Sequence, residues 1–125
     1  WDKIIDADNG VLSPRFCRAF FPDLRDDVRH YQVMAAQLYR ECSECVHGNA
    51  YTHIPVPDTL QYHNEAFHLW HKKADHAALI LSFSLALRYL PELDKTQNAT
   101  LELQLLDRLG HVRGVRLHYG ITGGE

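Results

Sequence analysis

The sequence predicts an all-α protein, a bundle of three or four helices with a short strand-like tail at the C-terminus. Apolar residues recur at helical spacing through three long segments. These segments cover approximately residues 26–46, 58–90 and 96–109. Each is followed by a residue that ends helices, namely Gly48, Pro91 or Gly110. With 125 residues, 46% of them apolar, the chain is expected to form a single helical domain, residues 1–125, without disulfide support.

The ends of the chain carry shorter predicted elements. Residues 1–12 are expected to form an extended lead-in, and Ser13-Pro14 predicts a helix start, because serine caps free N–H groups and proline suits the first helical position. Near the C-terminus, apolar and polar side chains alternate as they do in a strand. The alternating apolar residues are Val115, Leu117, Tyr119 and Ile121. A lone strand needs a partner, which favours pairing with the lead-in or with another part of a longer protein.

Composition narrows the class of protein. The net charge of −3 argues against a protein that wraps duplex nucleic acid, although a local basic patch can still engage a single RNA strand. Three cysteines are too few and too odd in number for a disulfide framework, and they fit the reducing cytoplasm. No apolar run reaches the roughly 18 to 20 residues of a membrane span, so we expect no membrane partner. The chain starts at Trp1 without a methionine, which favours a domain cut from a longer chain or a processed product.

The densest group of reactive residue types is the stretch LYRECSECVHGNA, residues 38–50, at the end of the first long helix. The side chains of this helix that are predicted to face the protein core are Tyr31, Ala35, Leu38, Cys42 and Cys45. Because Cys42 and Cys45 fall within this stripe, they are expected to be small core residues. Zinc is disfavoured there, since a zinc site needs ligands on a turn and two more nearby.

The opposite face of the same helix carries Arg40, Glu44 and His47. Glu44 lies one helical turn from each cation, so its carboxylate can bind both and favour the protonated imidazole. The helix C-terminus also favours a positive charge on His47. Cleavage of RNA by its own 2′-hydroxyl requires one group that moves protons and another that stabilises charge on the phosphate. A solvated helix face with an ordinary ion pair is the alternative interpretation.

Arg40 is followed by six residues, the last of them Val46, and then by His47 and Gly48 at a helix end. This pattern resembles the arginine-x(4–6)-histidine signature of HEPN domains. HEPN domains are small all-α bundles of prokaryotic defence and toxin systems, and many are metal-independent endoribonucleases with the motif at a dimer interface. The resemblance implies that Arg40 and His47 are catalytic, that Glu44 orients them and that Asn49 contacts substrate. It also implies RNA as a partner, a homodimer or larger protein assembly, and no cofactor. In several HEPN domains a polar residue, usually asparagine, directly follows the arginine, and this chain has Glu41 at that position.

A second arginine and histidine with the same spacing occur near the C-terminus. Arg113, four residues and His118 repeat the pattern, and Tyr119 follows as it does in some HEPN toxins. Arg108 and Arg116 make this end locally basic. Arg113 and His118 are therefore predicted to contact substrate, and they rank second as a catalytic pair because their segment is expected to be strand-like.

The second long helix begins with a histidine-rich run, HNEAFHLWHKKADH at residues 63–76. His68, His71 and Asp75 share one face of this helix and form a weak alternative site for zinc, nickel or iron. Two Glu-x-x-His pairs resemble those of di-iron bundles, but no convincing fourth glutamate lies in a helix interior. We therefore expect surface or partly buried histidines and no bound metal.

Three functions from different classes remain open. The first is a HEPN-like endoribonuclease that cleaves RNA by 2′-hydroxyl transesterification in a defence or toxin system. The second is a catalytically inactive helical module for interaction or sensing within a larger defence protein. The third, which the residues favour least, is a metal-binding helical bundle.

Overall fold

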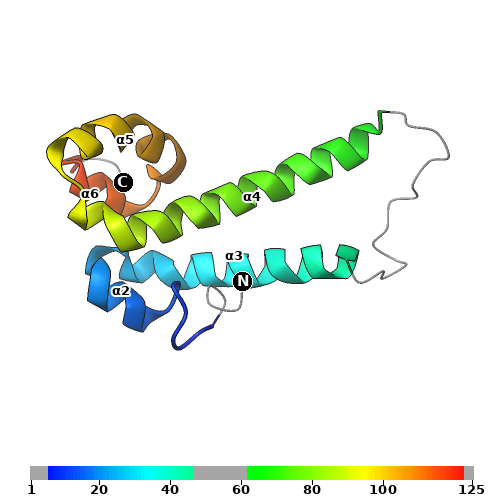
Figure 1. Ribbon diagram of the computed structural model, residues 1–125, viewed down its shortest axis with the longest axis horizontal. Helices are drawn as coiled ribbons and strands as arrows, with labels where there is room; N and C mark the ends of the chain where they lie inside the picture. The colour runs from blue at the N-terminus through cyan, green and yellow to red at the C-terminus, as the bar shows by residue number, and fades with distance from the viewer. Residues whose placement is uncertain (1–5, 47–61, 123–125) are drawn as a thin grey trace.

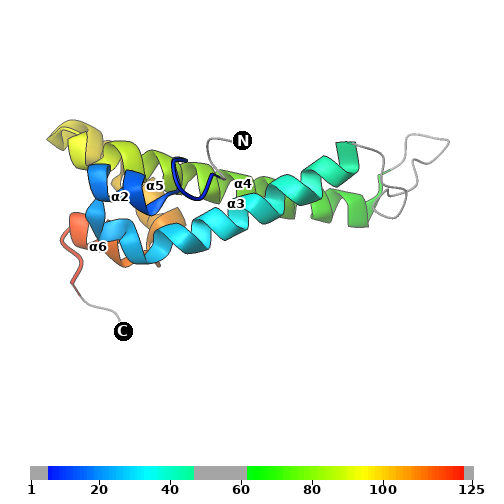
Figure 2. The same cartoon turned by 90° about the horizontal axis from the view of Figure 1, so that it is seen from below.

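The computed structural model describes residues 6–46 and 62–122, and every regular element in these ranges is helical. The elements are α2 (Pro14–Phe20), the 3-10 helix η1 (Pro22–Leu24), α3 (Arg25–Val46), α4 (Asn64–Tyr89), the 3-10 helix η2 (Leu90–Glu92), α5 (Lys95–Leu109) and α6 (Arg113–His118). The long helices α3 and α4 run side by side, and the shorter helices gather at one end of this pair (Figure 1). Seen after a quarter turn, α3 and α4 cross at an angle (Figure 2). The all-α prediction is confirmed.

Local capping explains several of the helix boundaries. Ser13 caps α2 as predicted, because its hydroxyl accepts a hydrogen bond of 3.2 Å from the Phe16 N–H, and a proline occupies the first turn. Asp94 and Gln97 form a reciprocal capping box at the start of α5. Gly110 ends α5, also as predicted. Each cap satisfies N–H or carbonyl groups that a helix end leaves without a partner.

The start of α4 differs from the prediction. The helix begins at Asn64, and residues 62 and 63 before it are not helical. The imidazole of His63 caps the helix by accepting a hydrogen bond of 3.2 Å from the Ala66 N–H. The helix is thus capped by a histidine nitrogen, six residues after the predicted start at about residue 58. Residue 58 and Gly48 lie outside the described residues.

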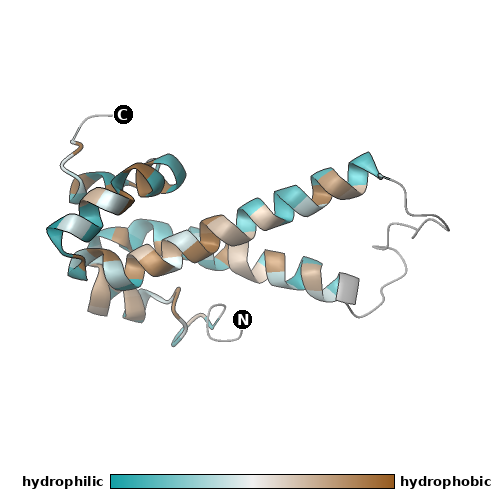
Figure 3. Cartoon of the chain, turned by 45° about the horizontal axis from the view of Figure 1, so that its top comes forward, coloured by the Kyte–Doolittle hydropathy of each residue, from teal (hydrophilic) through white to brown (hydrophobic). Residues whose placement is uncertain are grey.

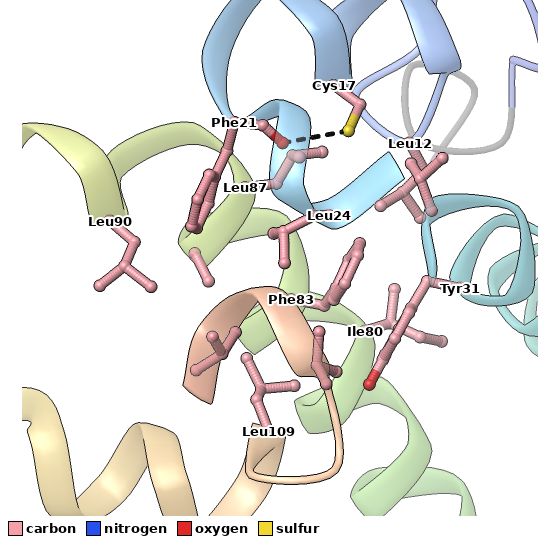
Figure 4. Packing of buried hydrophobic residues seen from close by; sticks show 14 of the residues in the cluster. Leu12, Cys17, Phe21, Leu24, Tyr31, Ile80, Phe83, Leu87, Leu90 and Leu109 are labelled. Atoms are coloured by element: carbon pink, nitrogen blue, oxygen red, sulfur yellow. Dashed lines mark hydrogen bonds between the residues drawn. The ribbon is translucent and has the colours of Figure 1, made fainter. Parts of the chain in front are cut away.

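The core lies where α2, α5 and α6 pack against the C-terminal half of α4 and the N-terminal half of α3 (Figure 4). At its centre the ring of Tyr31 stacks on that of Phe83, with ring centroids 3.8 Å apart and planes 7° from parallel. The Tyr31 hydroxyl lies 2.8 Å from Nε2 of His111. One tyrosine thus joins α3, α4 and the connection between α5 and α6.

Burial along α3 confirms Tyr31, Ala35 and Leu38 as core residues and contradicts the prediction for Cys42, which is exposed. The physical reason is that α3 and α4 diverge away from the core (Figures 1 and 3). Within the described residues, no side chain in 39–44 or 64–79 is buried. The stripe on α3 continues to Cys42, but α4 is no longer close enough to cover it. The side chain of Cys45 lies outside the described residues.

The tail predicted to be strand-like is a helix instead, α6. Val112 and Val115, three residues apart, are both fully buried, whereas Leu117 and Ile121 are exposed. This burial follows the period of a helix and not the alternation of a strand. A lone strand would leave its backbone groups unpaired, whereas a helix pairs them within the segment.

Gly114 allows α6 to approach η1 closely. A Cβ atom at this position would lie 2.6 Å from the Asp23 carbonyl oxygen and 2.8 Å from Cδ2 of Leu24. Both distances are too short for van der Waals contact, and the first involves backbone that cannot move aside without disturbing η1. The packing of α6 against the core therefore depends on glycine at this position.

We expect Gly114→Ala to lower the free energy of unfolding by about 1–2 kcal/mol, because the clash outweighs the helix propensity that alanine gains over glycine. Chemical denaturation monitored by circular dichroism measures this change. Leu103→Ala is the control, since Leu103 is 81% exposed on α5. Equal stability of Gly114→Ala and wild type would show that α6 can move away from η1 at little cost.

Candidate functional site

Two residues of the predicted catalytic motif lie on the last turns of α3. Arg40 and Glu44 are both exposed and one helical turn apart, so they share a side of the helix as predicted. Neither makes a hydrogen bond or ion pair with another residue in the described part of the chain. His47 and Asn49 lie outside the described residues.

Glu41, which follows the arginine of the motif, links α3 to α4. Its carboxylate accepts a hydrogen bond of 2.7 Å from Nζ of Lys73 and one of 2.9 Å from Nε2 of Gln37. These two hydrogen bonds, that from Lys73 above all, lower the pKa of Glu41 below its ordinary value. The carboxylate therefore bridges the two helices at the level where they begin to diverge.

A cleft of about 510 Å³ lies between α3 and α4 around this ion pair. Its lining residues are His30, Val33, Met34, Gln37, Leu38 and Glu41 from α3 and Leu69, Lys72, Lys73 and His76 from α4. Two lysines and two histidines face one carboxylate, so the cleft has an excess of groups that can bind an anion. Arg40 and Glu44 lie within one helical turn of Glu41 on α3, but neither is among the residues that line the cleft.

Arg113 and His118 are not brought together with Arg40. The helix α6 packs against η1, beside the start of α3 and at the opposite end of that helix from Arg40 (Figure 1). Five residues apart on a helix, Arg113 and His118 also point in directions roughly 140° apart. The Nε2 atom of His118 lies 2.9 Å from Oδ1 of Asn98, and burial lowers the pKa of its imidazole.

The structure assembles a second polar cleft that the sequence did not predict. This cleft, of about 420 Å³, contains Asp27, His111 and Arg113. Burial raises the pKa of Asp27, while the charge of His111 opposes that rise. Burial, with a smaller contribution from Asp27, raises the pKa of Tyr31 to about 12, so the hydroxyl beside His111 keeps its proton. A tyrosine in a core stripe was the available signal, because a buried phenol needs a hydrogen-bonding partner.

The histidine-rich start of α4 has the surface character expected from the sequence. His68, His71 and Asp75 are exposed. The ring of His71 lies edge-on to those of Phe67 and Trp70, with centroids 4.3 Å and 4.9 Å apart. Among the residues that the structure describes, no three histidine, cysteine or carboxylate side chains are grouped so as to bind a metal ion. The described residues therefore offer no preformed metal site.

Known proteins provide no further constraint on this site. No protein-family model, curated protein or solved structure matches the chain. The resemblance to HEPN domains stays a prediction that depends on the motif residues. In the described ranges, none of the helices has both the length and the apolar character that crossing a membrane requires.

The bridge between Glu41 and Lys73 makes stability depend on pH. Because the pKa of Glu41 is lowered by folding, its stabilising effect is present above the unfolded-state pKa and is lost as pH falls through the folded-state pKa. Between about pH 6 and pH 3, we expect wild type to lose about 0.5 kcal/mol more stability than Glu41→Gln, a small value because the pair is partly exposed. Urea denaturation across this range measures the difference.

Glu44→Gln is the matched control for that measurement. Glu44 is an exposed glutamate on the same helix and lacks a hydrogen bond to any described residue. Its variant should follow the pH dependence of wild type. A Glu41→Gln profile identical to wild type would mean that the bridge to Lys73 does not contribute to stability in solution.

Proposed function

We propose that this chain is a HEPN-like domain that cleaves RNA without a metal ion, in a cytoplasmic defence or toxin system. The observation that carries the proposal is the position of Arg40 and Glu44. Both are exposed on one side of α3, within one helical turn of Glu41, which lines the cleft that also contains Lys72 and Lys73. An arginine without an ionic partner among the described residues is available to a phosphate group.

The proposed reaction is transesterification within the RNA strand. The 2′-oxygen attacks the adjacent phosphorus atom and the bond from phosphorus to the 5′-oxygen breaks, which leaves a 2′,3′-cyclic phosphate and a 5′-hydroxyl. His47 takes the proton of the 2′-hydroxyl or donates a proton to the departing 5′-oxygen. Arg40 stabilises the charge that builds on the phosphate oxygens, and Glu44 orients the two cations. Asn49 is the proposed additional contact to substrate.

The cleft between α3 and α4 supports this proposal by offering a path for the strand. A single strand is bound by cations that follow its phosphates and by flat or apolar groups that contact its bases. Lys72 and Lys73 supply charge, the rings of His30 and His76 supply flat surfaces, and the apolar floor includes Met34. The strand would leave the cleft toward Arg40.

Cleavage of end-labelled RNA of mixed sequence in excess EDTA tests the proposal. We expect wild type to cleave and to leave cyclic-phosphate ends, and Arg40→Ala and His47→Ala to lower the rate about 100-fold or more. Arg15→Ala is the control, because Arg15 is an exposed arginine on α2. Its rate should equal that of wild type.

Other results of this cleavage assay would indicate a different active site or a different function. Cleavage that survives His47→Ala but is lost in His118→Ala would move the active site to α6. Absence of cleavage by wild type would favour the second candidate function, an interaction module. That candidate is supported by a run of exposed apolar side chains along α4 that includes Trp70 and Leu85.

A further inference from the structure

The helix α4 is apolar on two opposite sides. One side faces the core through Ile80, Phe83 and Leu87. The other side, which we call the outer stripe, consists of Phe67, Trp70, Ala74, Ala78, Leu81, Leu85 and Tyr89. Successive members are three or four residues apart, which is the spacing of a helix face that packs against another helix. The core accounts for the first side only.

The outer stripe is open to solvent. The exposed fractions are 45% for Phe67, 64% for Trp70, 47% for Leu81, 58% for Leu85 and 49% for Tyr89. Five large side chains, each about half exposed, leave on the order of 500 Å² of uncovered surface. That area is near the upper end of the roughly 300–600 Å² found for the largest apolar patch of a typical monomer. In Figure 1, α3 lies along one side of α4, and α5 covers only the C-terminal end of the other side.

The stripe leads into an apolar groove of about 430 Å³ between α4 and α5. Leu85 and Tyr89 belong to both the stripe and the groove. The remaining lining residues are Ser82, Ala86, Leu90, Leu93, Leu101, Gln104, Leu105 and Arg108. Its volume is within the roughly 300–1,000 Å³ of pockets that bind small apolar groups, so it can accept an aromatic side chain.

We propose that the outer stripe binds a second copy of this chain, with the two α4 helices antiparallel and each Trp70 inserted into the groove of the other copy. Trp70 and Leu85 are separated by roughly 22 Å along the helix. A two-fold axis midway between them passes close to Ala77 and Ala78 and brings each Trp70 opposite the partner's Leu85. The same patch then forms both sides of the contact, as a two-fold interface requires.

The distribution of side-chain sizes fits this pairing. Alanines at positions 74 and 78 occupy the middle of the stripe, where two crossing helices approach most closely. About the same axis, Leu81 of one copy lies opposite Ala74 of the other, so a large side chain meets a small one. Between residues 67 and 85, no lysine, arginine, aspartate or glutamate lies within roughly 60° of the centre of the stripe. The central part of the contact therefore buries no charge, and the charged side chains at its ends are Arg88, which pairs with Glu92, and Arg108, which lines the groove.

The area available also suits a dimer. A stable interface buries about 800 Å² on each partner. The five large side chains of the stripe provide on the order of 500 Å². The groove walls that enclose Trp70 add to this buried area, and they include Leu101 and Leu105. The small side chains between the large ones add further area. A buried aromatic anchor in an apolar pocket is also the arrangement that dominates binding energy at protein interfaces.

This contact does not depend on the proposed RNA cleavage. The stripe lies on the side of α4 away from α3, so the two copies of Arg40 would lie on the outer sides of the paired helices. This contact therefore differs from the dimer that the HEPN resemblance implies, in which the motif lies at the interface. Association can be measured without RNA, and loss of association would leave each Arg40 accessible. An experiment can therefore refute either the proposed dimer or the proposed RNA cleavage without refuting the other.

Sedimentation velocity over a range of protein concentrations tests the inference. We expect wild type to form a dimer, Trp70→Ala to raise the dimer dissociation constant about tenfold or more, and Leu85→Glu to give a monomer. Leu103→Glu is the control, because Leu103 is exposed on α5 and lies outside both stripe and groove. Circular dichroism establishes whether each variant is folded. If Leu85→Glu does not fold, the dissociation constant of Trp70→Ala alone tests the proposal.

A mixing experiment tests the reciprocal geometry. In a mixed dimer of Trp70→Ala and Leu85→Glu, both substitutions fall in one of the two contacts and the other contact is wild type. The mixture should therefore contain more dimer than either variant alone. A wild type that stays monomeric throughout, a dimer insensitive to both substitutions, or a mixture no better than its components would overturn the proposed arrangement.

Discussion

The stacking of Tyr31 on Phe83 is the contact on which the rest of the structure depends. It joins the two long helices within the cluster of buried residues that forms the core. The tyrosine hydroxyl, paired with His111, fixes the connection between α5 and α6 to the same place. That connection positions α6, whose close approach to η1 completes the core. Removing the ring would therefore leave a cavity where α3, α4 and the connection between α5 and α6 meet.

The fold class was predictable because helical periodicity and end signals agreed. Ser13 and Gly110 act through hydrogen bonds with near neighbours in the chain, and such local effects can be read from sequence. Cys42 could not be placed by the same reasoning. Its position in the apolar stripe of α3 is real, but burial depends on where α4 lies, and the divergence of the two helices is a property of the assembled molecule. The tail was wrongly predicted to be strand-like because apolar and polar residues alternate there over a few positions, as they do in a strand. Only the packing of the folded protein shows which of these side chains are buried.

The candidate site, too, could be predicted only where it depends on neighbouring residues in the chain. The common face of Arg40 and Glu44 follows from helix geometry alone, since both residues lie on α3 four positions apart. The bridge from Glu41 to Lys73 spans 32 positions, and the pairing of Tyr31 with His111 spans 80, so neither could be derived from spacing. Arg113 and His118 looked like a unit in the sequence, yet the short helix on which they lie turns them apart.

The divergence of α3 and α4 divides the molecule into a firm base and an arm with little tertiary support. Residues 39–44 and 64–79 contain no buried side chain in the described structure, whereas the base contains the whole core. Segments with few buried contacts open at a lower free energy than the global unfolding of a protein. The arm is therefore expected to open locally at a lower free energy than the base. Damage to the arm would leave the melting temperature of the protein almost unchanged, so thermal stability would be a poor guide to whether its surfaces still work.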